Sequence, residues 1–218
     1  MTDGPNADAE HYRREAMGAF AHEVRTPLTS IRMVLELARR QSGEGELVLD
    51  TELADMLRQS VDDLQRLADD LQEASRLERG KFTVSAGPTE LSAAVEAARE
   101  LLGGRVDISG PTPGRIEGPW DAPRLVRAIA GFTESANRIG DGSGMVQFQC
   151  IAGHECVQLV FESGELNEAA KPIAADAGFG FFRSRQFVLA MGGMVDYSRS
   201  ERHARITATL PTVRRGGA

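Results

Sequence analysis

The spacing of apolar residues changes after Gly80, and this change constrains the fold more than any other feature of the chain. From residue 11 to 40, and again from 53 to 77, apolar residues recur at alternating spacings of three and four. This spacing is typical of an amphipathic α-helix. The polar, glycine-containing stretch 41–46 separates the two runs, and Gly80 is a natural helix stop. The sequence therefore predicts two long antiparallel helices joined by a short loop.

A single pair of such helices would leave much of both apolar stripes in contact with water. Packing two pairs into a four-helix bundle would bury these stripes. We therefore expect the chain to form a homodimer through the helical hairpin.

Beyond Gly80 the apolar residues form short runs of the β type, separated by segments with helical spacing. Strands and helices mixed in this way indicate a layered α/β domain. The strands are expected at residues 81–85, 105–109, 145–151, 156–162, 194–197 and 204–210, and the helices near 89–102, 121–139 and 179–191. The predicted class is α+β, with a helical hairpin at 11–82, an α/β sandwich at 83–213, and disordered ends at 1–10 and 214–218.

The overall charge excludes one large class of partners. The 218 residues carry a formal net charge of −7, whereas a general nucleic-acid binder needs a surplus of Lys and Arg. No run of about 18 apolar residues occurs, and the first residues lack the basic and apolar regions of a secretory signal. We expect a cytoplasmic protein that does not insert directly into a membrane.

Two cysteines, Cys150 and Cys156, flank His154 in a short stretch of the second half. A tetrahedral metal site needs more ligands at a recognisable spacing than these three residues offer. The favoured interpretation is two reduced structural thiols on a hairpin, and no metal site is predicted.

His22 lies on the first predicted helix, on the side away from the apolar stripe. At about 100° per residue, Thr26 and Thr29 share its side and Glu23 flanks it. Pro27 has no N–H to offer the Glu23 carbonyl, so we expect a kink just after the histidine. The stripe that turns away from the histidine comprises Phe20, Val24, Leu28, Ile31 and Leu35.

An imidazole in this position is suited to carrying a phosphoryl group. One ring nitrogen can attack phosphorus while the other holds a proton. Glu23 is placed to accept that proton and to hold the ring tautomer. A surface His beside a Glu is more often a solvated helix face, so this pair alone does not assign a function.

The residues around His22 resemble a longer motif. Residues 20–31, FAHEVRTPLTSI, closely resemble the H-box of the sensor histidine kinase superfamily, and the resemblance extends through the second helix to Gly80. It implies that His22 is the phospho-acceptor and that Glu23 is its general base. It also implies that Thr26 orients water in the reverse, phosphatase reaction and that Pro27 is the kink of the family.

The same family places an ATP-binding sandwich of the histidine-kinase ATPase (Bergerat) type after the hairpin, and the second half follows that layout. Residues 120–129 resemble the entry to the helix whose two Asn side chains hold magnesium. The matching positions here are Gly131 and Ser135. Glycine offers no side chain, and a serine hydroxyl is a weaker magnesium ligand than an amide oxygen. Asn137 lies two places further on and should face elsewhere.

The remaining nucleotide-binding elements are also altered. At the family's adenine-binding Asp-x-Gly-x-Gly this chain has Glu162, Gly164 and Leu166, and the nucleotide lid is reduced to residues 167–176, with Lys171 as its only basic residue. The last glycine-rich turn retains Gly178 and Gly180 at the start of a helix. We infer a degenerate ATP site, with no cofactor expected and little or no autokinase activity.

The leading hypothesis is a histidine phosphotransferase of a phosphorelay, which exchanges a phosphoryl group between His22 and the aspartates of response-regulator receiver domains. The first alternative is a divergent histidine kinase/phosphatase that autophosphorylates His22 from ATP and magnesium. The second is a non-catalytic decoy that binds a kinase or a receiver. Receivers are expected to dock near the histidine, at Arg25, Leu28, Thr29 and Arg32.

Overall fold

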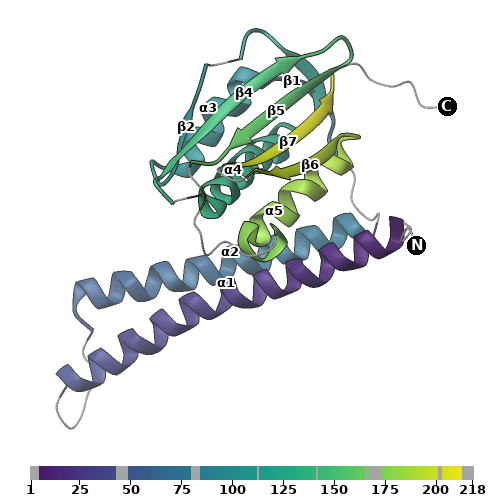
Figure 1. Cartoon of the computed structure of the whole chain (residues 1–218). Helices are drawn as coiled ribbons and strands as arrows, with labels where there is room; N and C mark the ends of the chain where they lie inside the picture. Colours follow the sequence, from purple (N-terminus) through teal and green to yellow (C-terminus); the bar gives the residue numbers. More distant parts are fainter. Residues whose placement is uncertain are drawn as a thin grey trace. The chain divides into compact units, whose positions relative to one another are not determined.

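The computed structural model describes residues 5–42, 49–79, 84–111, 113–140, 142–164, 166, 173–200 and 203–212. The chain divides into two compact units, residues 1–75 and 76–218. Figure 1 shows a helical hairpin in the first unit and a sheet with helices in the second. The expected boundary near residue 82 falls in the stretch 80–83, outside the described residues.

The first unit consists of α1 (Pro5–Gln41) and α2 (Thr51–Glu78), which run antiparallel along each other (Figure 1). Helix α1 begins six residues before the predicted start at residue 11. Proline at the start of a helix is favourable because the first N–H groups have no intrahelical partner. Asp50 caps α2, since its Oδ1 accepts a hydrogen bond of 2.8 Å from the Leu53 N–H.

One buried cluster of the first unit joins the two helices of the hairpin. Near the loop end of the hairpin, Val34, Ala38 and Leu53 are buried together, with Leu49 and Leu57 packed against them. An apolar stripe spans about 100° of a helix, so its sequence does not say which half faces the partner helix.

Two of the five residues that the helical projection assigned to the predicted seam lie outside it. Leu28 and Leu35 are 50% and 43% exposed, whereas Pro27 and Val34, one position earlier in each case, are buried. Leu28 and Leu35 are therefore not covered within the hairpin, in keeping with the expectation that a single pair of helices leaves part of its stripe in contact with water. Val61 of α2 is likewise 51% exposed, and we refer to Leu28, Leu35 and Val61 as the unpaired apolar surface of the hairpin.

The second unit contains a five-stranded sheet in the order β2-β4-β5-β7-β6 and a two-stranded antiparallel sheet β1-β3. In the larger sheet only the β2-β4 pair is parallel. The elements in chain order are β1 (Gly87–Glu90), α3 (Leu91–Leu102), β2 (Asp107–Ser109), β3 (Glu117–Trp120), α4 (Ala122–Ile139), β4 (Met145–Ala152), β5 (Cys156–Glu162), α5 (Ile173–Ala190), β6 (Met194–Arg199) and β7 (Ala204–Pro211).

Helices α3 and α4 lie on one face of the larger sheet (Figure 1), and α5 packs against α4. Alternate residues of the strands point toward this helical layer. Phe161 of β5 is buried there, with its ring centroid 5.6 Å from that of Phe132 on α4 and 5.3 Å from that of Phe148 on β4. These contacts form the core of the unit.

The predicted α+β class is confirmed, but the strands β1 and β3 were missed. Strands β1 and β3 contain Pro88 and Pro119, which weaken a strand pattern because proline cannot donate to a ladder. Of the predicted strand 81–85, residues 81–83 lie outside the described residues, and Val84 and Ser85 are not in a strand. Within the described part of the chain, no helix is both long enough and apolar enough to cross a membrane.

Candidate functional site

His22 lies near the middle of α1 and its side chain is exposed, as the helical projection predicts. Glu23 follows it and is half-buried, while Thr26, one helical turn further on, is exposed. Residues three or four apart on a helix are neighbours on its surface. The hairpin therefore presents an imidazole, a carboxylate and a hydroxyl within about one turn of one another.

Helix α1 continues through Pro27, so the expected kink does not interrupt it. Pro27 is buried, and the Thr29 hydroxyl donates a hydrogen bond of 2.8 Å to the Arg25 carbonyl one turn earlier. Because this hydroxyl bonds to its own helix, Thr29 is a weaker candidate for polar contact with a partner than its exposure suggests.

The residues predicted to bind a partner all lie at the surface. Arg25, Leu28, Thr29 and Arg32 are exposed on α1, and Leu28 is also one of the exposed apolar residues of the hairpin. No hydrogen bond or ion pair to the Arg25 or Arg32 side chain occurs within the described residues. Both guanidinium groups are therefore accessible to an acidic partner.

The two positions that the resemblance assigns to magnesium lie on the buried side of α4. Gly131 and Ser135 are buried, and the Ser135 hydroxyl donates a hydrogen bond of 2.7 Å to the Gly131 carbonyl. Asn137, which is partly exposed, does not replace them. Its Oδ1 instead accepts a hydrogen bond of 2.9 Å from the Gly144 N–H. This side of α4 therefore presents no carboxylate or amide oxygen from positions 131 and 135.

Helix α5 packs directly against these positions. A Cβ atom added to Gly131 would lie 2.2 Å from the Ser184 Oγ and 3.2 Å from the Gly180 carbonyl oxygen. A Cβ atom added to Gly180 would lie 4.0 Å from the Ser135 Oγ. Ser184 was not predicted as part of the site. Its signal in the sequence is that Gly131 and Ser135, like Gly180 and Ser184, are small residues four apart, a spacing that lets two helices approach closely.

Gly178 forms the turn that the sequence predicts before the last helix. Its φ of 77° and ψ of 174° are not helical and divide α5 into a short first segment and a helix that starts at Phe179. A positive φ of this size is accessible to glycine at little steric cost. The Gly-x-Gly pattern thus has a structural explanation that does not require a nucleotide.

Glu162 does not lie with the other nucleotide-site residues. It is the neighbour in sequence of Phe161, which faces the helical layer, so its side chain points to the opposite face of the sheet. There its carboxylate pairs with Arg205 of β7, with both oxygens 3.3 Å from Nη2. The structure therefore brings Gly131, Ser135 and Gly180 together but places Glu162 elsewhere.

The side chain nearest the end of α4 is Ser163, which follows β5 directly and which the sequence pattern did not select. A Cβ atom on Gly140, at the end of α4, would lie 2.9 Å from the Ser163 Cβ and 3.3 Å from the Gly164 N. The Ser163 hydroxyl accepts a hydrogen bond from the Ala204 N–H and donates one to the Gly164 carbonyl, both 2.9 Å. Leu166 is half-buried, and most of the reduced lid, 167–172 including Lys171, lies outside the described residues.

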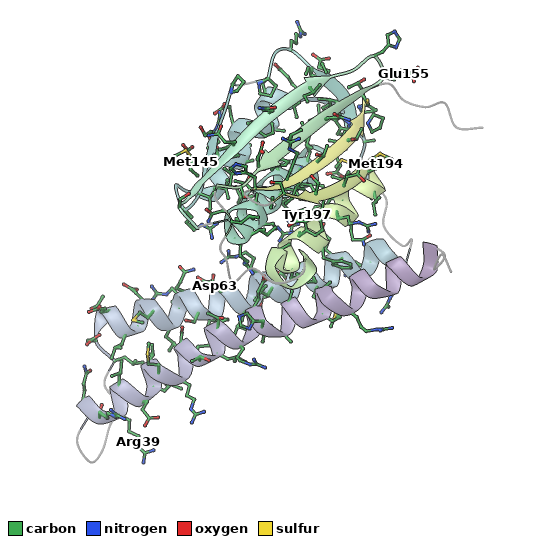
Figure 2. All side chains as sticks on the ribbon, viewed as in Figure 1. Arg39, Asp63, Met145, Glu155, Met194 and Tyr197 are labelled. Atoms are coloured by element: carbon green, nitrogen blue, oxygen red, sulfur yellow. The ribbon has the colours of Figure 1, made fainter. Side chains whose placement is uncertain are left out.

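The two cysteines lie on the hairpin of β4 and β5, whose turn is marked by Glu155 in Figure 2. Cys150 is aligned with Leu159 and Cys156 with Pro211, so the thiols are not opposite each other. Burial raises the pKa of the Cys150 thiol. Among the described residues, no group of three or more His, Cys, Asp or Glu side chains could hold a metal ion.

The chain is similar to proteins of known family. Residues 12–80 match the family model of the His Kinase A (phospho-acceptor) domain. The signal transduction histidine-protein kinase BaeS of Escherichia coli K12 is 27% identical over 157 residues, covering 70% of this chain and 33% of BaeS. The sensor histidine kinase Hik34 of Synechocystis is 27% identical over 171 residues, covering 74% of this chain and 36% of Hik34. The chain thus spans about a third of the length of these curated relatives.

Solved structures share the fold at lower sequence identity. The Acinetobacter baumannii histidine kinase AdeS superimposes with a TM-score of 0.67 at 19% identity, covering 88% of this chain and 98% of that chain. Full-length ShkA, solved in complex with AMPPNP, gives a TM-score of 0.56 at 19% identity, with coverages of 92% and 46%. At this level of identity the likeness establishes the fold alone.

Proposed function

We propose that the chain is a sensor histidine kinase superfamily protein that carries a phosphoryl group on His22 in a phosphorelay, because residues 12–80 match the His Kinase A (phospho-acceptor) domain and the curated relatives are histidine kinases. The observation that carries the proposal is the exposed His22 with Glu23 beside it and Thr26 one turn on, within the matched domain. The partners are the receiver domains of response regulators.

The chemistry is a reversible transfer between aspartate and histidine. The unprotonated ring nitrogen of His22 attacks the phosphorus of an aspartyl phosphate, so that a P–N bond forms and the P–O bond to the receiver breaks. The aspartate leaves as a carboxylate. Glu23 accepts or holds the proton of the other ring nitrogen, which limits positive charge on the phosphorylated ring. Transfer to a second receiver reverses these steps.

The proposed source of the phosphate is a receiver rather than ATP. Phosphoryl transfer from ATP depends on positioning and on magnesium, which neutralises the developing charge. Gly131 and Ser135 offer no amide oxygen, and the Glu162 carboxylate is paired with Arg205 on the other face of the sheet. These three features support loss of ATP binding and an autokinase activity that is absent or very low.

The unpaired apolar surface of the hairpin supports a homodimer. Leu28, Leu35 and Val61 are each more than two-fifths exposed in the single chain. A four-helix bundle with a second copy would bury them. Sedimentation equilibrium at micromolar concentration is expected to give twice the mass of the chain, and a stable monomer would refute this part of the proposal.

Radiolabel transfer tests the proposed function directly. A receiver phosphorylated on its aspartate is expected to label the wild-type chain but not His22→Gln. His154→Gln is the matched control, because His154 is exposed on the turn between β4 and β5 and has no proposed role. If no cognate receiver transfers label to the wild type, the phosphotransferase assignment is wrong.

The divergent kinase/phosphatase remains the second candidate because Thr26 is exposed next to His22 and the curated relatives are histidine kinases. Isothermal titration with ATP and magnesium, followed by incubation with labelled ATP, separates the two functions. We expect neither binding nor label. Transfer of label from ATP to His22 would show that the chain is a kinase rather than a phosphotransferase. If the wild type dephosphorylates a receiver and Thr26→Ala does not, the chain is a phosphatase.

A further inference from the structure

Helices α4 and α5 are joined by a close contact between small residues at the positions where the family holds magnesium. We propose that this contact itself excludes the nucleotide, because Ser184 and Gly180 of α5 fill the space beside Gly131 that a ligand side chain would need. The inference deepens the proposed loss of ATP binding and rests on it. Gly131 then has a packing role, besides offering no side chain to magnesium. Ser184 is the residue that would prevent an asparagine from being restored at position 131.

The distances leave no room for a side chain at position 131. A Cβ atom there would lie 2.2 Å from the Ser184 Oγ, 3.2 Å from the Gly180 carbonyl oxygen and 3.3 Å from the Arg183 Nη2. The guanidinium end of an arginine can move, but the Gly180 carbonyl belongs to the helix backbone. An asparagine would place three further heavy atoms beyond this Cβ. Adding the family's asparagine therefore requires the Ser184 hydroxyl to turn away or be removed, and α5 to shift by a few tenths of an ångström at the Gly180 carbonyl.

The contact extends along both helices, so a movement of α5 away from Gly131 would disturb further contacts. Ser135 lies beside Gly180 and Gly131 beside Ser184. One step further out, the ring centroids of Phe132 and Phe181 are 5.9 Å apart. At the other end, the Arg127 guanidinium lies 5.4 Å from the centroid of the Phe187 ring. A shift of α5 that opened space at Gly131 would break these aromatic contacts as well.

Of the residues in this contact, Ser184 is the one whose side chain can be shortened without loss of stability. Its side chain is fully buried, and its Oγ has no hydrogen-bond partner within the described part of the chain. A buried hydroxyl without a partner is unfavourable. Ser184→Ala removes the one atom that lies 2.2 Å from a Cβ at position 131 and leaves the other neighbours at 3.2 Å or more.

A double-mutant cycle tests the packing part of the inference. Trp120 is the single tryptophan of the chain and is buried in the second unit, so its fluorescence reports unfolding of that unit. We expect Gly131→Ala to lower the Tm by several degrees, although alanine is the better helix former. Ser184→Ala alone is expected to leave the Tm unchanged or higher, and Ser184→Ala combined with Gly131→Ala to recover most of the loss.

Two glycines with open surroundings provide the controls. Gly114 lies in the second unit and Gly18 in helix α1, and a Cβ atom at either position would meet nothing within 4 Å. Gly114→Ala should leave the fluorescence transition unchanged, and Gly18→Ala should raise the helical signal measured by circular dichroism. If Gly131→Ala is as harmless as Gly114→Ala, or if Ser184→Ala does not rescue it, the inference is overturned.

The nucleotide part is tested with Mg·ATP as the probe. Gly131→Asn with Ser135→Asn is expected to remain without binding by isothermal titration and to unfold at lower temperature than the wild type. Binding by this variant, with an unchanged Tm, would overturn the inference. Binding of Mg·ATP by the wild type would instead refute the proposed loss of ATP binding, while receiver-to-His22 label transfer tests the phosphotransferase independently of both results.

Discussion

Asp121 supports the start of α4, and its replacement by alanine should destabilise the second unit strongly. The side chain is 3% exposed and its Oδ1 accepts a hydrogen bond of 3.3 Å from the Arg124 N–H, which makes it the N-cap of the helix. Its Oδ2 accepts one of 3.0 Å from the Ser85 N–H and also pairs with the Arg124 guanidinium, which is 14% exposed. One carboxylate thus joins the helix to the segment before β1.

The magnitude follows from what the substitution removes. Loss of an N-cap costs about 1 kcal/mol, whereas removing one partner of a buried ion pair costs about 3–5 kcal/mol because the other charge is left buried. These contributions share the same atoms, so we expect a total of about 3–5 kcal/mol for Asp121→Ala rather than their sum. For a unit of this size, that corresponds to a Tm lower by roughly 10–15 °C.

Trp120 fluorescence during thermal and urea unfolding measures this loss. Asp121→Asn keeps an oxygen for the Arg124 N–H but removes the charge. It should therefore retain the N-cap but still show most of the destabilisation expected for Asp121→Ala. Asp50→Ala, at the exposed cap of α2, is the comparison in the hairpin and should lose only about 1 kcal/mol. A loss below about 1.5 kcal/mol in Asp121→Ala would refute the assignment of a buried pair.

Further predictions concern the dimer, the sheet and one thiol. Leu28→Glu should shift the sedimentation equilibrium toward monomer, because it places a charge in the proposed bundle, whereas an unchanged dimer would show that the apolar surface is not the interface. Arg205→Ala should change stability by less than about 1 kcal/mol, since its pair with Glu162 is partly exposed, and a larger loss in urea unfolding would contradict this. Cys150 should react with iodoacetamide at pH 8 more slowly in the folded than in the urea-unfolded chain, because burial keeps its thiol protonated; equal rates would exclude this.

Several features of this protein could be predicted from the sequence because they depend on local spacing. The helical hairpin, the exposure of His22 and the turn at Gly178 follow from apolar periodicity and from the backbone freedom of glycine. The long helices of the hairpin and most strands of the larger sheet were predicted for the same reason. Strands β1 and β3 were missed because each is short and contains a proline, which weakens the strand pattern. Their pairing also joins residues that lie far apart in sequence, which a local pattern does not contain.

Tertiary structure alone decided how the altered nucleotide positions relate to one another. The sequence indicated that Gly131 and Ser135 lack magnesium ligands, but only the packing of α5 on α4 showed that Ser184 fills the adjoining space. Likewise, the sequence places Glu162 at the adenine-binding position of the resemblance, whereas the pleat of β5 turns its side chain toward Arg205 on the opposite face. Residue identity and spacing determine which chemistry a helix surface can present, but which groups meet depends on contacts between distant segments, which a local pattern does not contain.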